Sequence, residues 1–393
     1  MKKLLKFFYK FDLLIATLIT VLFLVLIETI AVNIDFLDPL EMAVADIEFS
    51  DLAYKVFEDN DDVVIDTNIV LINVGELSRE MIARQVEIIN RYNPKVVGFD
   101  IIFEKRKQKI SDSLLSAAFS RVENLVLVNI LGKSDDSIPY FDVNRASNEI
   151  FAQYAHNGFA NLPEGNSYRT VRNFYPKLYH DTIKLNAFAT EIIKHYDPMV
   201  YTKFISRNNA SEIIKYRGNF SKFYYLDYSD VFDPEMDLSF IENKIVLFGY
   251  LGSSFAEMEY SLKDKFFTPL NDRYVGRSYP DMFGLTIHAN IISMIIQETY
   301  ITDLSVFTNF LFSFVILYIN AFVFHFIHKK YFNFYGGLSK VIMVFESVIL
   351  LFICLIIFHT FRVQIDAKLS IIGLIFLPDI LEAYLRIKYK KRS

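Results

Sequence analysis

The segment from Asn68 to Phe103 reads NIVLINVGELSREMIARQVEIINRYNPKVVGFDIIF, and its pattern of apolar residues decides the fold. It opens with a short β-rich run, Asn68 to Val74. Apolar side chains then recur at the spacing of one helix face, at Met81, Ile82, Val86 and Ile89. Asn93-Pro94 ends this helix, and the run from Lys95 to Phe103 is apolar enough for a central strand. These elements predict a parallel sheet with right-handed crossovers.

The same alternation continues on the C-terminal side of this segment. A second helix is predicted from about Asp112, which we expect to act as its N-cap, to Val122. A third strand follows from Leu125 to Leu131. Three later elements are an amphipathic helix near Leu185 to His195, a buried strand at Lys244 to Tyr250, and a helix at Gly284 to Gln297. We therefore predict one α/β domain with a mainly parallel sheet flanked by helices.

Strongly apolar runs lie at both ends of the chain, and a helix needs about 20 apolar residues to cross a membrane. The runs are Leu13 to Ile27, Val306 to Ile327, Val341 to Phe361 and Leu369 to Leu385. They predict four transmembrane α-helices, one N-terminal and three C-terminal. The expected boundaries are a basic N-terminus at 1–10, helices at 11–32, 304–327, 341–361 and 369–385, an extracytoplasmic domain at 33–303, and a basic tail at 386–393.

The basic residues beside these runs predict the orientation of the chain, because such residues gather on the cytosolic side. They are Lys2, Lys3, Lys6 and Lys10, then Lys329, Lys330 and Lys340, then Arg386, Lys388, Lys390, Lys391 and Arg392. An even number of spans places both termini in the cytosol and the α/β domain outside. The first run also fits a cleaved signal peptide, but no small-x-small cleavage pattern follows Glu28, which favours a retained anchor.

The composition excludes several classes of function for the outer domain. The sole cysteine, Cys354, lies in a predicted span, so the domain has no disulfide, thiol nucleophile or cysteine-based zinc site. The net charge of −5 argues against nucleic acid as a partner. The seven histidines are scattered, and no G-x-S-x-G or HExxH motif occurs. We therefore expect a protein that is not an enzyme and that holds no metal or other cofactor.

Candidate ligand-binding residues follow the predicted strands, since ligands of parallel sheets bind beyond the carboxyl ends of the strands. Asp100 would form the floor of such a pocket, and Asn73 and Asn129 would line its rim together with Gly75 and Gly249. The alternative is that Asp100 is a buried carboxylate that accepts backbone N–H groups of a neighbouring loop. That structural role is the more common one for an ordered polar group in a sheet.

Four further candidates lie outside the strands. Arg172 would bind an anionic ligand or form a surface ion pair. His288 and Asn290 open the last helix of the domain, where structural capping is the expected role. His288 is also a candidate partner of Asp100 or of Asp264.

Three carboxylates lie within the predicted C-terminal spans. They are Glu346, Asp379 and Glu382, and ionisable residues inside a bilayer are usually paired or functional. One interpretation is that they reach the inner interface and meet Lys340 or Arg386. The other is that they bind a basic residue of a partner subunit. Both stay open at this point.

Four motifs in order resemble the extracellular CHASE2 sensor domain. They are PKVVGFDIIF from Pro94, KIVLFGYLGSS from Lys244, the pair Thr268-Pro269, and GLTIHANII from Gly284. The arrangement of one N-terminal and three C-terminal spans is also usual in that family. One motif departs: the family tends to show D-G-x-V-R where this chain has Tyr168 to Arg172, and only its last two residues agree.

The resemblance implies a membrane-anchored sensor in a bacterial inner membrane, with its large domain in the periplasm. Family members usually continue into a kinase or a nucleotide cyclase, and this sequence shows none. We therefore expect relay of a small-molecule stimulus of unknown identity, through the C-terminal helices, to a separate membrane or cytosolic effector. The alternative is a structural or accessory subunit of a bacterial membrane complex. A homo-oligomer is compatible with both.

Overall fold

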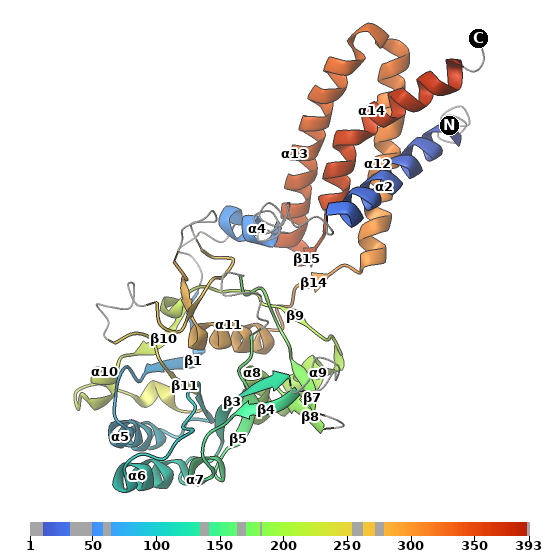
Figure 1. Cartoon of the computed structure of the whole chain (residues 1–393). Coiled ribbons are helices and arrows are strands. Elements are labelled where there is room, and N and C mark those ends of the chain that lie inside the picture. Colours follow the sequence, from blue (N-terminus) through green and yellow to red (C-terminus); the bar gives the residue numbers. More distant parts are fainter. Residues whose placement is uncertain are drawn as a thin grey trace. The chain divides into compact units, whose positions relative to one another are not determined.

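The computed structural model describes residues 11–31, 49–57, 64–133, 141–162, 170–180, 183–253, 262–271 and 279–390. The chain divides into two compact units (Figure 1). The α/β unit comprises Tyr54–Ile301, and the helical unit comprises Met1–Ala53 together with Thr302–Ser393. The predicted basic N-terminus, 1–10, and the last three residues of the predicted basic tail, 386–393, lie outside the described residues.

The α/β unit is built on a seven-stranded sheet that is mainly parallel, as the sequence predicts. Its parallel strands are β1 (Asp66–Asn73), β2 (Val96–Phe99), β3 (Leu125–Lys133), β5 (His156–Phe159), β10 (Phe223–Leu226) and β11 (Ile245–Gly249). The seventh strand, β4 (Phe141–Arg145), pairs antiparallel with β3. The order is β10-β1-β11-β2-β3-β4, and β5 pairs with β3. Strand β11 therefore lies between the two strands that the opening segment predicts.

The central strand β2 is shorter than its apolar sequence predicts. It ends at Phe99, which pairs with Phe248 of β11, so Asp100 lies just beyond the strand. The Asp100 N–H still donates to the Phe248 carbonyl at 2.9 Å. The shorter strand places the Asp100 side chain at the carboxyl edge of the sheet.

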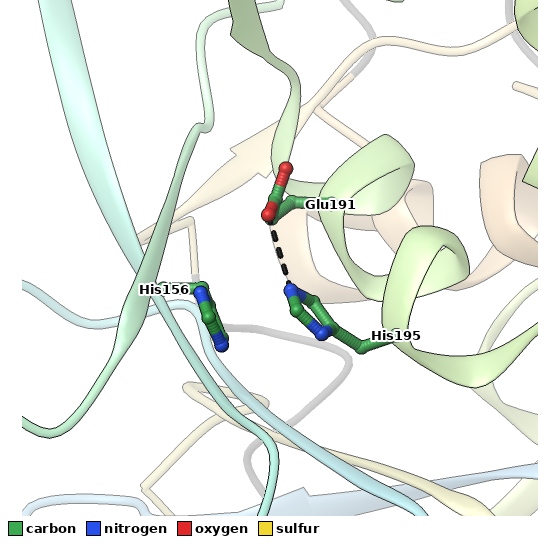
Figure 2. A group of neighbouring side chains, drawn as sticks. All are labelled: His156, Glu191 and His195. Carbon is green, nitrogen blue, oxygen red and sulfur yellow. Dashed lines mark hydrogen bonds and ion pairs between the residues drawn. The ribbon is translucent and has the colours of Figure 1, made fainter. Parts of the chain in front are cut away.

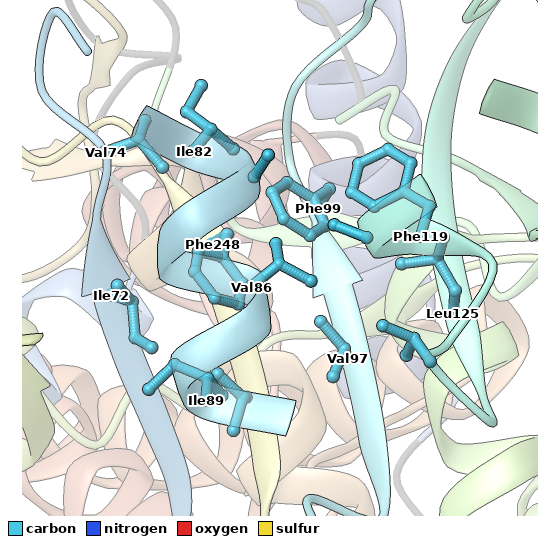
Figure 3. Close-up of a cluster of buried hydrophobic side chains, with 14 of the residues drawn as sticks. Ile72, Val74, Ile82, Val86, Ile89, Val97, Phe99, Phe119, Leu125 and Phe248 are labelled. Carbon is cyan, nitrogen blue, oxygen red and sulfur yellow. The ribbon is translucent and has the colours of Figure 1, made fainter. Parts of the chain in front are cut away.

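One face of the sheet is covered by α5 (Arg79–Asn90) and α6 (Lys109–Phe119). Helix α5 begins after Ser78, whose hydroxyl accepts the Met81 N–H. The apolar face of α5 packs on the strands, and Phe99 stacks on Phe248 with ring centroids 4.5 Å apart (Figure 3). The buried side chains of this cluster include Ile72, Ile82, Val86, Ile89, Val97 and Leu125.

The expectation that Asp112 is the N-cap of α6 is wrong, because the helix begins earlier. Its N-cap is Gln108, and Asp112 lies within the first turn, where it is buried. Its carboxylate instead accepts the Lys107 N–H at 2.8 Å and pairs with the Arg79 guanidinium at 2.5 Å. Asp112 therefore joins α6 to α5.

The other face of the sheet packs against α8 (Phe188–Tyr196) and α11 (Gly284–Ile296). A Cβ on Gly98 would lie 2.8 Å from the Ile192 side chain, and one on Gly249 would lie 2.9 Å from Leu285. Glycine at these two positions lets the helices approach the strands closely. The other helices that the structure describes in this unit are α7 (Glu149–Ala152), α9 (Pro198–Ser206), α10 (Tyr228–Phe232), η2 (Phe220–Lys222) and η3 (Ser239–Ile241).

Three two-stranded sheets complete the α/β unit within the described residues. They pair β6 (Asn173–Phe174) with β9 (Glu212–Ile213), β7 (Lys177–His180) with β8 (Ile183–Asn186), and β12 (Lys265–Phe266) with β13 (Met282–Phe283). The last pair leads directly into α11, so the start of that helix is held by a short hairpin-like sheet.

The helical unit contains α2 (Phe11–Ala31), α12 (Val306–Lys330), α13 (Tyr335–Phe361) and α14 (Lys368–Lys390), with η5 (Phe332–Phe334) between α12 and α13. Helix α4 (Phe49–Phe57) crosses the boundary between the units. Helices α12 and α14 pack closely: a Cβ on Gly373 would lie 2.6 Å from the Leu317 side chain. The Ser370 hydroxyl also bonds to that of Ser313 at 2.9 Å.

Two helices of the described chain are long and apolar enough to span a membrane, Val306–Lys330 and Phe332–Phe361. The apolar part of the first helix is shorter, Phe11–Leu26. Helix α14 contains Pro378 and several charged residues. The first and fourth spans therefore remain predictions.

Candidate functional site

The carboxyl ends of four neighbouring parallel strands bring the predicted polar residues to one edge of the sheet. The strand register pairs Asn73 with Gly249 and Phe99 with Phe248, so Asn73, Gly249 and Asp100 lie at one level. Asn129 lies further along β3, opposite Phe159 of β5. This edge is where ligands of parallel sheets bind.

Asp100 and Asp264 meet at the first residue of α11. A Cβ on Gly284 would lie 3.6 Å from an oxygen of each carboxyl group. The backbone carbonyl of Asp264 also accepts the Gly284 N–H at 3.0 Å, with Asp264 at a φ of 60°. Aspartate enters this left-handed region more readily than most residues. Two carboxylates that are 164 positions apart in sequence are thus held around one helix terminus, the positive end of the helix dipole.

The two carboxyl groups hold their protons more tightly than ordinary aspartates. Burial raises the pKa of Asp100 to about 6. Burial and, to a smaller extent, the charge of Asp100 raise the pKa of Asp264 to about 7, which the Lys263 ammonium partly offsets. Because Asp264 also contacts solvent, water screens part of this repulsion. The pair can therefore gain or lose a proton near neutral pH.

The Thr268-Pro269 motif is tied to a third carboxylate near the start of α11, Asp281. That carboxylate accepts the Thr268 N–H at 2.9 Å and the Thr268 hydroxyl at 2.5 Å. The Asn271 amide donates to it as well, at 3.1 Å. Burial raises the pKa of Asp281 to about 6, although these hydrogen bonds oppose the rise. The motif shapes the loop that precedes α11.

Asn73 is a structural residue at this edge. Its amide donates to the Asp227 carboxylate at 2.9 Å and to the Gly252 carbonyl at 3.0 Å. Its side-chain oxygen accepts the N–H groups of Gly75 and Leu251. The side chain is fully buried, and these bonds occupy both of its ends. Asn73 thus joins three loops at the strand ends and has no capacity left for a ligand.

Asn129 has an unused acceptor. The residue is buried, and its side-chain oxygen has no hydrogen-bond partner among the described residues. Its backbone carbonyl accepts the Ala160 N–H at 2.9 Å. Of the strand-end candidates, Asn129 and Asp100 therefore have the side chains most able to accept a new donor.

His288 is a buried residue of α11 that contacts an aromatic ring, and it neither caps the helix nor bonds to Asp100 or Asp264. Its ring lies edge-on to Phe188 of α8, with centroids 5.2 Å apart. Burial lowers the pKa of His288 to about 4, so the imidazole is neutral. Its Nδ1 has no hydrogen-bond partner among the described residues. The residue links α11 to α8.

Asn290 holds a turn of the chain against α11. Its side-chain oxygen accepts the Arg217 N–H at 2.6 Å, and its amide donates to the Gly218 carbonyl at 2.9 Å. The amide also donates to Thr286 within the helix. Asn290 therefore has a structural role, but it bonds to a remote turn and does not cap the helix.

Arg172 lies beside the β9 segment, and the N–H of its neighbour Val171 donates to the Phe267 carbonyl at 2.8 Å. The Arg172 carbonyl accepts the Ile214 N–H at 2.8 Å. The Val171 carbonyl accepts the Tyr216 hydroxyl at 2.7 Å. The part of the Tyr168 to Arg172 motif before residue 170 lies outside the described residues.

The three carboxylates of the helical unit differ in their partners. Glu382 pairs with Arg386 one turn later at 2.6 Å, as the interfacial interpretation expects. Asp379 is exposed on α14. Glu346 is only partly exposed on α13, and its Oε2 has no partner among the described residues.

Sequence analysis missed a cluster of His156, Glu191 and His195, which lies apart from the strand-end carboxylates (Figure 2). His156 begins β5, whereas Glu191 and His195 lie one turn apart on α8. The four-residue spacing on a predicted helix was a usable signal, but His156 is 35 residues before Glu191 and no local pattern connects them. Only the packing of β5 beside α8 brings the three together.

The chain was compared with known proteins. The family model of the CHASE2 domain matches residues 17–322. The match begins within α2 and ends within α12, so it includes the whole α/β unit. Searches of curated proteins and of solved structures found no match.

Proposed function

This chain belongs to the CHASE2 domain family, and from that premise we propose that it is a membrane-anchored sensor whose C-terminal helices relay an extracytoplasmic stimulus to a separate effector protein. CHASE2 is a family of extracellular sensor domains, and two helices of this chain can span a membrane. The proposed location is a bacterial inner membrane, with four spans and both termini in the cytosol. The proposed role is not enzymatic.

The observation that carries this proposal is the position of α11 in the chain. The helix begins at the carboxylate pair Asp100 and Asp264, and it is buried from Gly284 to Ile295. Its 13 residues form a rod about 20 Å long, at roughly 1.5 Å per residue. Residues 297–305 then connect it to α12, the first candidate span after the domain. A displacement at the start of α11 would therefore reach the membrane helix through the chain itself.

A small parallel sheet in the helical unit supports the relay. Strand β14 (Thr302–Asp303) precedes α12, and it pairs with β15 (Val363–Gln364), which lies between α13 and α14. The Thr302 N–H donates to the Arg362 carbonyl at 2.8 Å. The chain that enters α12 is thus hydrogen-bonded to the connection between the next two helices. Movement of β14 would be transmitted to all three C-terminal helices.

The experiment is mild-detergent purification of the full-length protein from its native membrane, followed by mass spectrometry and activity assays of what co-purifies. We expect a signalling enzyme whose activity differs between the wild type and Asp100→Asn, which removes one charge of the pair. Thr302→Pro removes one of the N–H groups that join β14 to β15, so Asp100→Asn should no longer change the enzyme activity in a protein that already carries Thr302→Pro. Glu235→Gln, an exposed carboxylate, is the matched control and should behave like the wild type.

The sensor proposal fails if no signalling enzyme co-purifies, or if its activity is the same in the wild type and in Asp100→Asn. A large assembly without a signalling enzyme would instead favour an accessory subunit of a membrane complex. Glu346 supports that second function, because its Oε2 lies in a candidate span without a partner among the described residues, and such a group is suited to a basic residue of another chain. Glu346→Leu would then dissociate the assembly on native gels, whereas Asp379→Leu, at an exposed site on α14, would act only if that helix also contacts the partner.

A further inference from the structure

The cluster of His156, Glu191 and His195 brings together the ligand atoms of a possible metal site. One ligand atom from each residue lies within 4.8 Å of the other two. The Glu191 Oε1 and the His195 Nε2 are 3.1 Å apart, and the two imidazole rings stack with centroids 3.9 Å apart (Figure 2). The three side chains point toward one another from two different elements, β5 and α8. Because the stacked rings are nearly parallel, their nitrogens do not yet point at one centre, and a metal ion would require the exposed His156 ring to turn about its side-chain bonds.

The backbones that carry these residues are held together by close packing. A Cβ on Gly158 of β5 would lie 2.6 Å from the Phe188 Cα of α8, a distance that only glycine permits. Phe159 also forms a parallel bridge with Ala187, the residue before the helix. The distance from His156 to α8 is therefore set by the core of the unit and not by the exposed side chains. Such rigid support is what a preorganised site requires.

Neighbouring side chains orient the carboxylate. The buried Asn186 amide donates to Glu191 Oε2 at 2.7 Å, and it also lies 3.2 Å from the Tyr201 hydroxyl. Outer partners of this kind orient ligating carboxylates in metal sites. The Lys194 ammonium lies 2.7 Å from Oε1, on a side chain that is 43% exposed and free to turn into solvent. Lys194 thus supplies a positive charge that a metal ion would replace.

The donor set decides which ions fit. Two imidazole nitrogens and one carboxylate oxygen suit Zn²⁺ and its neighbours Cu²⁺ and Ni²⁺, whereas Mg²⁺ and Ca²⁺ prefer sites made of oxygen only. Zinc sites with three protein ligands of this type keep a fourth position for water. His156 is exposed, so that position is open to solvent. From this geometry we propose that His156, Glu191 and His195 bind a divalent transition-metal ion of the Zn²⁺ type. The proposal does not depend on the sensor function.

The test uses the full-length protein, purified in detergent through a tag without histidine and stripped with a chelator. Calorimetric titration with ZnCl₂ should show one site per chain, and titration with MgCl₂ should show none. X-ray absorption of the zinc-loaded protein should show two imidazole ligands. His156→Ala removes an exposed ligand, so the fold is kept, and it should weaken Zn²⁺ binding by about 100-fold. His195→Ala should have a similar effect, whereas Glu235→Gln should bind like the wild type.

The proposal is overturned by no Zn²⁺ binding by the wild type, by equal affinity in His156→Ala, or by an absorption spectrum without imidazole scattering. If His195→Ala fails to fold, the Zn²⁺ affinity of His156→Ala relative to the wild type decides the test. A hydrogen-exchange measurement adds a second readout, because an ion that joins β5 to α8 should slow exchange in both elements. Unchanged exchange in the zinc-loaded wild type would also contradict the site.

Discussion

At the scale of single residues, the chemistry of the α/β unit is concentrated in carboxyl groups whose pKa is raised. Asp100 and Asp264 share the start of α11, and Asp281 lies in the loop before it. The folded state holds their protons up to a pH of about 6 to 7, whereas an unfolded chain releases them near its ordinary pKa of about 4. Between these limits the folded state binds more protons, so its stability falls as the pH rises.

The charge of Asp100 should therefore lower the stability of the unit at pH 7.5. Asp100→Asn removes that charge, and we expect it to raise the free energy of unfolding by about 1 kcal/mol. This value is smaller than the pKa shift alone would give, because solvent reaches the pair and screens its charges. The gain should shrink as the pH falls to 5, where the wild-type carboxyl is protonated. The gain in stability is measured by hydrogen exchange of the β2 and β11 amides in the full-length protein. A loss of stability at pH 7.5 would contradict the argument, and Glu235→Gln is the control.

At the scale of elements, glycines decide which helices approach closely. In the helical unit, Gly373 of α14 faces Leu317 of α12, beside the hydrogen bond between Ser370 and Ser313. Small residues of this kind allow close contact between helices in membranes, where the packing of side chains supplies much of the attraction. Gly336, in the first turn of α13, has no atom within 4 Å of its added Cβ. Gly336 therefore serves as a matched control for Gly373, because only Gly373 has another helix close to its added Cβ.

Alanine at these two positions should have opposite effects. Gly373→Ala would place a methyl group 2.6 Å from Leu317, so we expect a loss of about 1–3 kcal/mol in the packing of α12 on α14. Gly336→Ala adds only helix propensity, which should leave stability unchanged or raise it by up to about 1 kcal/mol. The stabilities of the two variants are compared by unfolding the full-length protein in mixed detergent and following the loss of helix by circular dichroism. Equal stability of the two variants would show that Gly373 is not in contact.

At the scale of the whole molecule, the two units combine a CHASE2 domain with a group of apolar helices. The helices α12 and α13 have the length and hydropathy of membrane spans. The proposed relay needs α2 and α14 to span as well, so that the α/β unit lies outside and both ends of the chain lie inside. This topology makes a definite prediction for each connecting segment.

Single cysteines can test the topology, since Cys354 is the sole native cysteine and can be changed to serine. A membrane-impermeant maleimide should label Glu235→Cys and Asp366→Cys from outside, because both residues are exposed and lie on the proposed outer side. Tyr331→Cys, between α12 and α13, should be labelled only after the membrane is opened. Labelling of Tyr331→Cys from outside would contradict the proposed orientation of the chain. Protection of Asp366→Cys from the reagent would contradict the proposal that both α13 and α14 span the membrane.

Local patterns of side chains were sufficient for the longer elements with a clear period, whereas the strands β4, β5 and β10 were not predicted. The runs that predict β1, α5, β3 and α11 match the observed helices and strands to within a few residues, because burial of one face or both faces imposes a period on neighbouring residues. The same reasoning placed Asp100 and Asn73 at the carboxyl edge of a parallel sheet. The ordered motifs also identified the family, which the family match confirms.

Contacts between distant segments were decided only by the tertiary structure. The insertion of β11 between β1 and β2, and the addition of β10, set which strand ends are neighbours. That order and the packing of α11 bring Asp264 to Asp100, and the approach of α8 to β5 brings His195 to His156. Sequence periodicity reports which face of an element is buried, but it does not report the element that covers it. The sequence by itself therefore determined the elements with a clear period and the family, and packing decided which side chains meet.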